Sequence, residues 1–472
     1  MNFHKRFNDE ERMRRWIPRI FATAALPCCC AALLLVAGAA GGQESPSPAP
    51  TPGAPIAPAA PVAPAPAPPH LSPLAKAPDW SRLEVFQGTI THDEFLHLLN
   101  DVYAQDGAWK AAITVNDDSA VIAEDAADPA KKFTLHFAAP GSAPKKAPHY
   151  WRAVSSLPPA TEKRPLAGIR IALDPGHLGG KWARMEERWF VIGDSKPVCE
   201  GDMTLLTAKI LAAKLRALGA TVLFVRSAPG PVTNVRPADL LAVARTELKA
   251  RQQLRFVRDK YDNPADPLRQ NSVQWESELL FYRNAEIHAR GKIVNGDLRP
   301  DLTLCMHYNA EPWGDETKPK LTDKDHFHLI INGSYEPGEL ALDDVRFEML
   351  FKLLTRSYPE ELAISKQVAA TFSEETGLPA YAYAQPSPAE HPVPDQPYLW
   401  LRNLLANRLY RNPTIYIEPY VMNNQFVFDR VQAGDYEGAK LIDGALRKSI
   451  YREYADAVAD GLVEYFKEAR KK

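Results

Sequence analysis

The sequence predicts an α/β fold: a twisted, mostly parallel sheet flanked by helices on both faces, preceded by a small N-terminal α+β module. From about residue 165 onward, short apolar runs alternate with helical patterns, as expected of a parallel sheet covered on both sides. One complete βαβ unit can be followed. The apolar run Ile169–Leu173 ends at Asp-Pro-Gly, a helical pattern covers Asp202–Leu218 up to a terminal glycine, and Thr221–Val225 returns as a strand.

Three further strands and a final helix are expected to complete this domain, which spans residues 166–472. The strands are Leu302–Met306, Phe327–Ile331 and Thr414–Ile417. The helix lies near Tyr451–Ala469, where apolar side chains recur at helical spacing. Two helical insertions, near residues 227–278 and 333–400, interrupt the alternation.

The small module is expected over residues 79–154. Thr91–Glu94 has the sequence of a capping box and should open a helix with one apolar face. Strand-like runs follow at Ala111–Val115 and Phe133–Phe137. Nothing in these residues indicates chemistry, so the pattern favours a spacer or docking role over catalysis.

The N-terminal segment, residues 1–43, has the pattern of an export signal. A basic leader is followed by an uncharged apolar stretch that ends in the small residues Ala37-Gly38-Ala39. The alternative is an uncleaved membrane anchor, because the apolar stretch approaches the length of a membrane span. Residues 44–78 are rich in proline and alanine and predict a disordered linker. The folded part is therefore expected outside the cytoplasm, in the periplasm or cell envelope, with membrane contact only through an uncleaved N-terminus.

Composition excludes some classes of partner. The chain of 472 residues has a formal net charge of −2 and no basic stripe, which argues against nucleic acid as a partner. Of five cysteines, only Cys199 and Cys305 fall in the folded part. They could pair in an oxidising compartment or remain buried free thiols, and their spacing does not fit a cysteine zinc site.

Three side chains with metal-binding chemistry stand at the ends of predicted elements. His177 follows Asp-Pro-Gly after one strand, His307 follows another strand, and Glu200 begins the helix between them. Open α/β sheets place their ligand sites at the carboxyl ends of the strands, so these side chains should meet at one edge. Two histidines and one glutamate leave a position open for water, which is the composition of a catalytic zinc site. The sequence predicts one Zn²⁺ as cofactor.

A further carboxylate, Glu418, closes the last predicted strand. Alone it would be interpreted as a helix cap or a salt bridge at a strand end. Beside a zinc ion, an unligated glutamate is suited to take a proton from water and pass it to a leaving nitrogen. The four residues together predict a zinc hydrolase.

The motifs resemble those of a known family. The run I-x-L-D-P-G-H at Ile171–His177, Glu200 at a helix start, and L-x-x-H-x-N-A at Leu304–Ala310 are similar to the zinc-dependent N-acetylmuramoyl-L-alanine amidases of the type 3 catalytic domain. The likeness continues through Arg290–Asn295 and Tyr416–Asn423 in the family's order.

This resemblance implies a zinc ion held by His177, Glu200 and His307, with Glu418 acting first as general base and then as general acid. It implies peptidoglycan as the partner. The bond cut would be the amide between N-acetylmuramic acid and the L-alanine that begins the stem peptide. A related zinc peptidase or deacylase acting on another amide, or a non-catalytic wall-binding module, are the alternatives.

The long interval between His177 and Glu200 departs from the family pattern. It contains Glu186 and Glu187 as rival ligands, and Glu200 is preferred because it opens the predicted helix. Trp182 and Trp189 lie in the same interval and are candidates for substrate contact, although loop tryptophans also serve to pin a loop down.

Three other features bear on substrate and regulation. His328 is a further candidate for substrate contact; it shares one face of a predicted strand with His326, and sheet packing is the alternative. Pro419 and Tyr420 stand where the family has a small residue and glycine. The insertion Ser227–Glu278 suggests a cover over the metal that an activator or regulatory protein removes.

Overall fold

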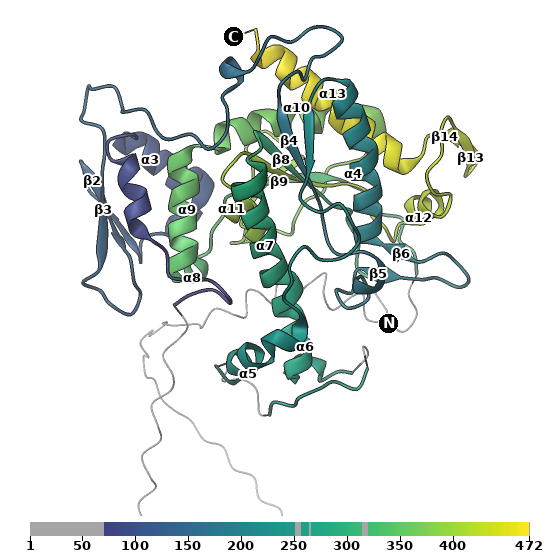
Figure 1. The fold of residues 1–472 in the computed structure, drawn as a ribbon, viewed down its shortest axis with the longest axis horizontal. Helices are drawn as coiled ribbons and strands as arrows, with labels where there is room; N and C mark the ends of the chain where they lie inside the picture. The colour runs from purple at the N-terminus through teal and green to yellow at the C-terminus, as the bar shows by residue number, and fades with distance from the viewer. Residues whose placement is uncertain (1–69, 251–255, 264–265, 314–319, 472) are drawn as a thin grey trace, which may run out of the picture. The chain divides into compact units, whose positions relative to one another are not determined.

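The computed structural model describes residues 70–250, 256–263, 266–313 and 320–471 (Figure 1). The predicted export signal over residues 1–43, and the linker up to residue 69, lie outside the described residues. Within the part that is described, no helix combines the length and the apolar character needed to cross a membrane.

A seven-stranded sheet forms the centre of the molecule, in the order β10-β11-β9-β12-β8-β4-β7. Its strands are β4 (Arg170–Pro175), β7 (Thr221–Phe224), β8 (Leu302–Met306), β9 (His328–Ile331), β10 (Glu390–Pro392), β11 (Leu399–Arg402) and β12 (Thr414–Glu418). Strands β7, β4, β8 and β12 run parallel, β9 is antiparallel to β12, and β10 is antiparallel to β11. The mostly parallel sheet expected from the sequence is confirmed, with β10 and β11 as additional strands contributed by the second insertion.

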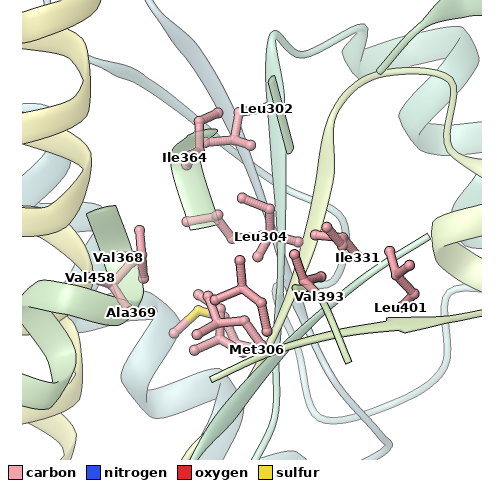
Figure 2. Packing of buried hydrophobic residues seen from close by; sticks show 14 of the residues in the cluster. Leu302, Leu304, Met306, Ile331, Ile364, Val368, Ala369, Val393, Leu401 and Val458 are labelled. Atoms are coloured by element: carbon pink, nitrogen blue, oxygen red, sulfur yellow. The ribbon is translucent and has the colours of Figure 1, made fainter. Parts of the chain in front are cut away.

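Helices cover both faces of this sheet. One face packs against α4 (Glu200–Ala217), α10 (Tyr358–Thr376) and α13 (Ile450–Ala469). The opposite face packs against α7 (Glu286–Lys292) and α11 (Leu405–Leu409). Figure 2 shows the first layer, in which Leu304 and Met306 of β8 point toward Val368 of α10. Cys305, between those two residues, belongs to the cluster on the opposite face, as the two-residue period of a strand requires.

The first insertion is only partly helical. It contains η7 (Pro237–Leu240) and α5 (Leu241–Ala250), and α6 (Val273–Leu279) continues through η9 (Leu280–Ala285) and α7 into η10 (Ile293–Leu298). Figure 1 shows α5 and α6 beyond the lower end of the sheet. Their apolar side chains pack against Leu178, Trp182 and Met185, in the loop that follows β4.

The N-terminal module is α+β, as expected. It consists of η2 (Trp80–Phe86), α3 (His92–Leu98), η3 (Leu99–Tyr103), η4 (Gln105–Gly107) and an antiparallel sheet of β1 (Ile113–Val115), β2 (Ser119–Ala123) and β3 (Lys132–His136). The side chain of Thr91 accepts a hydrogen bond from the amide of Glu94, which confirms one half of the capping box. The carboxylate of Glu94 instead pairs with Arg356.

This module shares its core with the second insertion. Trp80 and Phe86 make edge-to-face contacts with Phe347 and Phe351 of α9 (Asp343–Thr355), at centroid distances of 5.4 and 5.9 Å. Because these rings are buried together, the module is anchored to the sheet domain through α9. The remaining elements are η5 (Val154–Ser156), η6 (Gly180–Trp182), β5 (Trp189–Phe190), β6 (Val198–Cys199), η8 (Arg269–Asn271), α8 (Pro337–Leu340), α12 (Gln425–Gln432), β13 (Lys440–Ile442) and β14 (Ala445–Arg447).

Candidate metal centre

Three adjacent parallel strands end at the same edge of the sheet, and each delivers one of the predicted side chains there. His177 follows β4, His307 follows β8, and Glu418 is the last residue of β12. The strands are in register, with Cys305 of β8 opposite both Asp174 of β4 and Tyr416 of β12. Their carboxyl ends are therefore level, which brings residues far apart in the sequence to one place.

A glycine makes the close approach of the two histidines geometrically feasible. A Cβ atom on Gly176 would lie 2.3 Å from Cε1 of His307, so only glycine fits between the ring and the end of β4. The next residue, His177, has a φ of 57°, in the left-handed region. This turn directs the His177 ring back across the strand end, where the two imidazoles meet edge to face at a centroid distance of 4.9 Å.

Glu200 enters the site as the first residue of α4 and is 1% exposed. A Cβ atom on Gly201 would lie 2.3 Å from the backbone carbon of Leu178, so this second glycine lets the loop after His177 rest on the first turn of α4. One oxygen of Glu200, Oε1, accepts a hydrogen bond of 3.1 Å from the amide of Tyr308. That bond ties the carboxylate to the loop carrying His307.

The three ligand atoms converge on one position. Nε2 of His177 lies 3.3 Å from Oε2 of Glu200, and Nδ1 of His307 lies 3.3 Å from Oε1 of the same carboxylate. All three ligand atoms lie within 4.8 Å of one another. Two imidazole nitrogens and one carboxylate oxygen at this separation form a donor set that suits Zn²⁺ and leaves a coordination position open.

The charge states of Glu200 and His177 fit a cation. Burial lowers the pKa of His307, but the carboxylates of Glu418 and Glu200 outweigh it and raise that pKa, so a metal ion would displace a proton from this ring. Burial raises the pKa of the Glu200 carboxyl, but its electrostatic interaction with His177 and a hydrogen bond with His307 outweigh burial and lower that pKa to about 2. The Glu200 carboxylate is therefore ionised, yet its buried Oε2 has no hydrogen-bond partner among the described residues. Burial lowers the pKa of His177, which favours the neutral imidazole that a metal requires. A divalent cation would satisfy the orphaned oxygen.

Glu186 holds His177 from behind. Its Oε1 lies 2.7 Å from Nδ1 of His177, and its Oε2 accepts a hydrogen bond of 2.6 Å from the amide of Leu178. Since a carboxylate can only accept, Nδ1 carries the proton and Nε2 presents its lone pair toward Glu200. The other rival ligand, Glu187, pairs with Arg269. Sequence reasoning missed this supporting role of Glu186, for which a carboxylate nine residues after the histidine was the only signal.

A buried ionic layer lies beneath the site and was also missed. Asp174 of β4 accepts hydrogen bonds from Arg290 at 2.9 Å and from the hydroxyl of Tyr410 at 2.6 Å. Arg290 also donates to the carbonyl of His177 at 3.2 Å and pairs with Glu286. The aspartate of the Asp-Pro-Gly-His run thus fixes the strand end through Arg290 rather than binding the ion itself.

Glu418 lies beside the trio. Its Oε1 is 3.9 Å from Nδ1 of His307, and its side chain is 18% exposed. It thus stands next to the position where the ligand atoms converge, outside the group of three that would hold the ion. The ring of His307 is held between this carboxylate and the face of Tyr416, on which it stacks at 5.1 Å.

The three candidates for substrate contact have different surroundings. Trp182 packs on Phe281 at 5.5 Å, with the guanidinium of Arg236 5.3 Å from its ring. Trp189 carries the guanidinium of Arg184 at 4.2 Å and lines an open depression on the surface.

The third candidate, His328, is buried. It is 3% exposed, and its Nε2 lies 2.9 Å from the hydroxyl of Tyr383. It pairs with Glu418 across the β9–β12 ladder, so it lies next to the site on the floor of the sheet. His326, on the same face, pairs with Glu311 at 2.9 Å.

The two cysteines of the folded part are free thiols. Burial raises the pKa of Cys199 to about 12 and that of Cys305 well above its usual value, so both are neutral. Of the two readings that the sequence left open, the structure has the unpaired one.

No family model and no curated protein matches this chain. Solved structures of amidases are among those that are similar to it. Ami1 from Mycobacterium smegmatis is 16% identical, covering 64% of this chain and 99% of its own, with a TM-score of 0.35. CwlD from Clostridioides difficile, solved in complex with the GerS lipoprotein, is 11% identical, covering 63% and 98%, with a TM-score of 0.34. AmiC2 of Nostoc punctiforme is 13% identical, covering 63% and 96%, with a TM-score of 0.32.

Proposed function

We propose that this protein is a zinc-dependent peptidoglycan hydrolase that cuts the amide bond between N-acetylmuramic acid and L-alanine. The observation that carries the proposal is the convergence of His177, Glu200 and His307, with the ionised Glu200 carboxylate keeping one buried oxygen without a hydrogen-bond partner among the described residues, and with Glu418 beside them. The sequence motifs that place these residues resemble those of the type 3 amidases, which supports this choice of amide. The predicted export signal agrees with a substrate outside the cytoplasm.

The bound ion would be held by two neutral imidazoles and one carboxylate, so it would keep part of its positive charge. Zinc in that position supplies a Lewis acid that polarises a carbonyl and makes water more acidic. Glu186 and Arg290 keep His177 in the orientation that presents Nε2, and the Tyr416 ring keeps His307 in place.

Glu418 performs the proton transfers. Its carboxylate accepts the proton that water loses on attacking the amide carbon, and then returns it to the nitrogen of the departing L-alanine. The departing nitrogen must be protonated because a nitrogen anion is a poor leaving group. The separation of 3.9 Å between Oε1 of Glu418 and Nδ1 of His307 supports this role, because it brings the carboxylate close to the position where the ligand atoms converge.

One departure from the family pattern concerns the packing of the strand end. Tyr420 is 1% exposed, and its hydroxyl donates to Glu453 at 2.7 Å. It has a φ of 55° and is enclosed by Tyr308, Phe372 and Tyr454. The residue therefore shapes the core beneath Glu418 and does not face a substrate.

The test is digestion of purified sacculi by the full-length protein, followed by mass analysis of the released peptides. We expect stem peptides with a new L-alanine amino terminus, no release after treatment with a zinc chelator, and recovery on adding zinc. Fragments cut within the stem would identify a peptidase instead. Binding of the protein to the sacculi without release of any fragment would identify a binding module. Adding candidate envelope proteins to the same assay tests for the activator that the insertions suggest.

A further inference from the structure

An open depression of about 690 Å³ lies beside the metal centre and takes no part in the proposed chemistry. It is bounded by the β5–β6 hairpin, the first turns of α4, and the facing ends of α12 and α13. Its lining includes Arg184, Trp189, Lys196, Met203, Leu206 and Tyr451. Most of the exposed lining surface is apolar, and three basic side chains stand around it.

The hairpin separates this depression from the metal. Trp189 of β5 pairs with Cys199 of β6, and both line the depression. Phe190 and Val198 form the other pair and are buried in the core. The residue that follows Cys199 is the metal ligand Glu200, whose amide donates to the carbonyl of Arg188. Trp189 and Cys199 thus face the depression from one side of the strand pair, and Phe190 and Val198 face the core from the other.

The basic side chains of the depression lack acidic partners. No carboxylate of the described residues forms an ion pair with Lys181, Arg184 or Lys196, and all three are exposed. The guanidinium of Arg184 lies over the Trp189 ring at 4.2 Å, which orients it and leaves its N–H edges free. The ammonium group of Lys196 donates to the backbone carbonyl of Gln432 at 3.4 Å, and the backbone of Lys196 exchanges hydrogen bonds of 2.9 and 3.0 Å with the side-chain amide of Gln432.

Asp202, the one acidic residue of the lining, leaves an excess of positive charge, because it is a single carboxylate among three basic side chains. Both carboxylate oxygens of Asp202 accept the amide of Gly180, at 2.9 and 3.1 Å. The depression therefore has a positive rim over an apolar floor formed by Met203, Leu206 and Tyr451.

We infer that this depression binds the stem peptide of the substrate through its free carboxylates, a subsite that rests on the proposed function. Arg184 offers a planar guanidinium suited to a carboxylate, and Lys196 and Lys181 add positive charge. The apolar floor can contact the aliphatic parts of the peptide side chains. An extended peptide spans roughly 3.5 Å per residue, so a stem peptide of several residues can extend beyond the metal position toward the depression. We choose the stem peptide as the occupant for two reasons. The depression begins at Cys199, one residue before the metal ligand Glu200, and its basic side chains have no acidic partners among the described residues.

The experiment is calorimetric titration of the full-length protein, at low salt, with the free stem peptide and with the same peptide after conversion of its carboxylates to amides. We expect the acid form to bind and the amide form to bind at least about tenfold more weakly. The double substitution Arg184→Gln with Lys196→Gln should weaken binding of the acid form by about tenfold or more. Raising the salt concentration should weaken it as well, because these cations are exposed.

Lys209→Gln is the matched control, since Lys209 is exposed on α4 outside the depression and should leave binding unchanged. Equal binding of the acid and amide forms, or full binding by the double variant, would overturn the subsite. The sacculus digestion reports separately on the chemistry. If the protein cleaves the wall but the double substitution does not weaken peptide binding, the subsite is wrong and the proposed function stands. If the peptide binds as expected but digestion releases no peptides with L-alanine amino termini, the proposed function is wrong.

Discussion

Glu186 and His177 form a hydrogen-bonded pair in which Nδ1 of the imidazole lies 2.7 Å from the carboxylate. Glu186 is 8% exposed, and its second oxygen is held by the amide of Leu178. The pair decides which nitrogen of His177 faces Glu200. Metal-binding histidines commonly depend on such a partner, which orients the ring and raises its basicity.

Replacing Glu186 with alanine should therefore weaken zinc binding by about 10- to 100-fold while leaving the fold intact. The physical reason is that Nδ1 loses its acceptor, so the ring can rotate and change tautomer. Competition with a chromogenic chelator measures this affinity directly.

Glu187→Ala provides the control for that measurement. This neighbouring carboxylate pairs with Arg269 instead of His177, so its loss should leave zinc affinity unchanged. Equal effects of the two substitutions would contradict the role assigned to Glu186.

Glu418→Gln should retain zinc and lose about 10²- to 10⁴-fold in turnover, because an amide cannot accept a proton from water. His177→Ala should lose both zinc and activity, since it removes one of three ligands. Metal content by atomic spectroscopy and release of stem peptides from sacculi separate the two outcomes. Wild-type turnover by Glu418→Gln would remove this residue from the mechanism.

Gly176→Ala should lower both thermal stability and zinc affinity. The added methyl would lie 2.3 Å from the His307 ring, and the ring or the strand end must move to admit it. Overpacking of this kind costs about 1–3 kcal/mol. Gly296→Ala is the control, because no atom lies within 4 Å of its added methyl. Thermal melts with and without zinc compare the two, and a harmless Gly176→Ala would contradict the close approach of the histidines.

Glu360→Gln should change the pH dependence of stability. Burial, helped by the nearby carboxylates of Asp301 and Glu361, raises the pKa of Glu360 from 4.5 to about 7. Between these values the folded protein holds a proton that the unfolded chain has released, so stability falls as pH rises through this window. Glutamine does not ionise and can still accept the bond from Trp151.

The Glu360→Gln variant should consequently melt at a higher temperature than the wild type at pH 8, and at the same temperature at pH 4.5. Melting curves across this range measure the difference. A constant offset between the two proteins at every pH would show that ionisation of Glu360 is not its cause.

Periodicity and terminal residues were sufficient to locate the strands that build the site. The run at β8 was predicted with its observed bounds, and β4 and β12 within one or two residues. These strands are buried on both faces, so they appear as short apolar runs closed by polar residues. The direction of β9 could not be predicted, because the same run of apolar residues serves a parallel or an antiparallel strand. The edge strand β10 lies in a proline-rich stretch without such a run, and β11, its neighbour in the sheet, begins directly after that stretch.

The sequence by itself determined the residue types of the metal site, the strand and helix ends that carry them, and the glycines beside them, because these depend on local backbone and side-chain chemistry. Only the tertiary structure decided that Glu186 supports His177, that Arg290 locks Asp174, and that Lys196 and Arg184 share one depression. Those relationships join residues whose neighbours in the chain give no sign of the contact. Burial and distance decide them, and both arise only when the layers have packed.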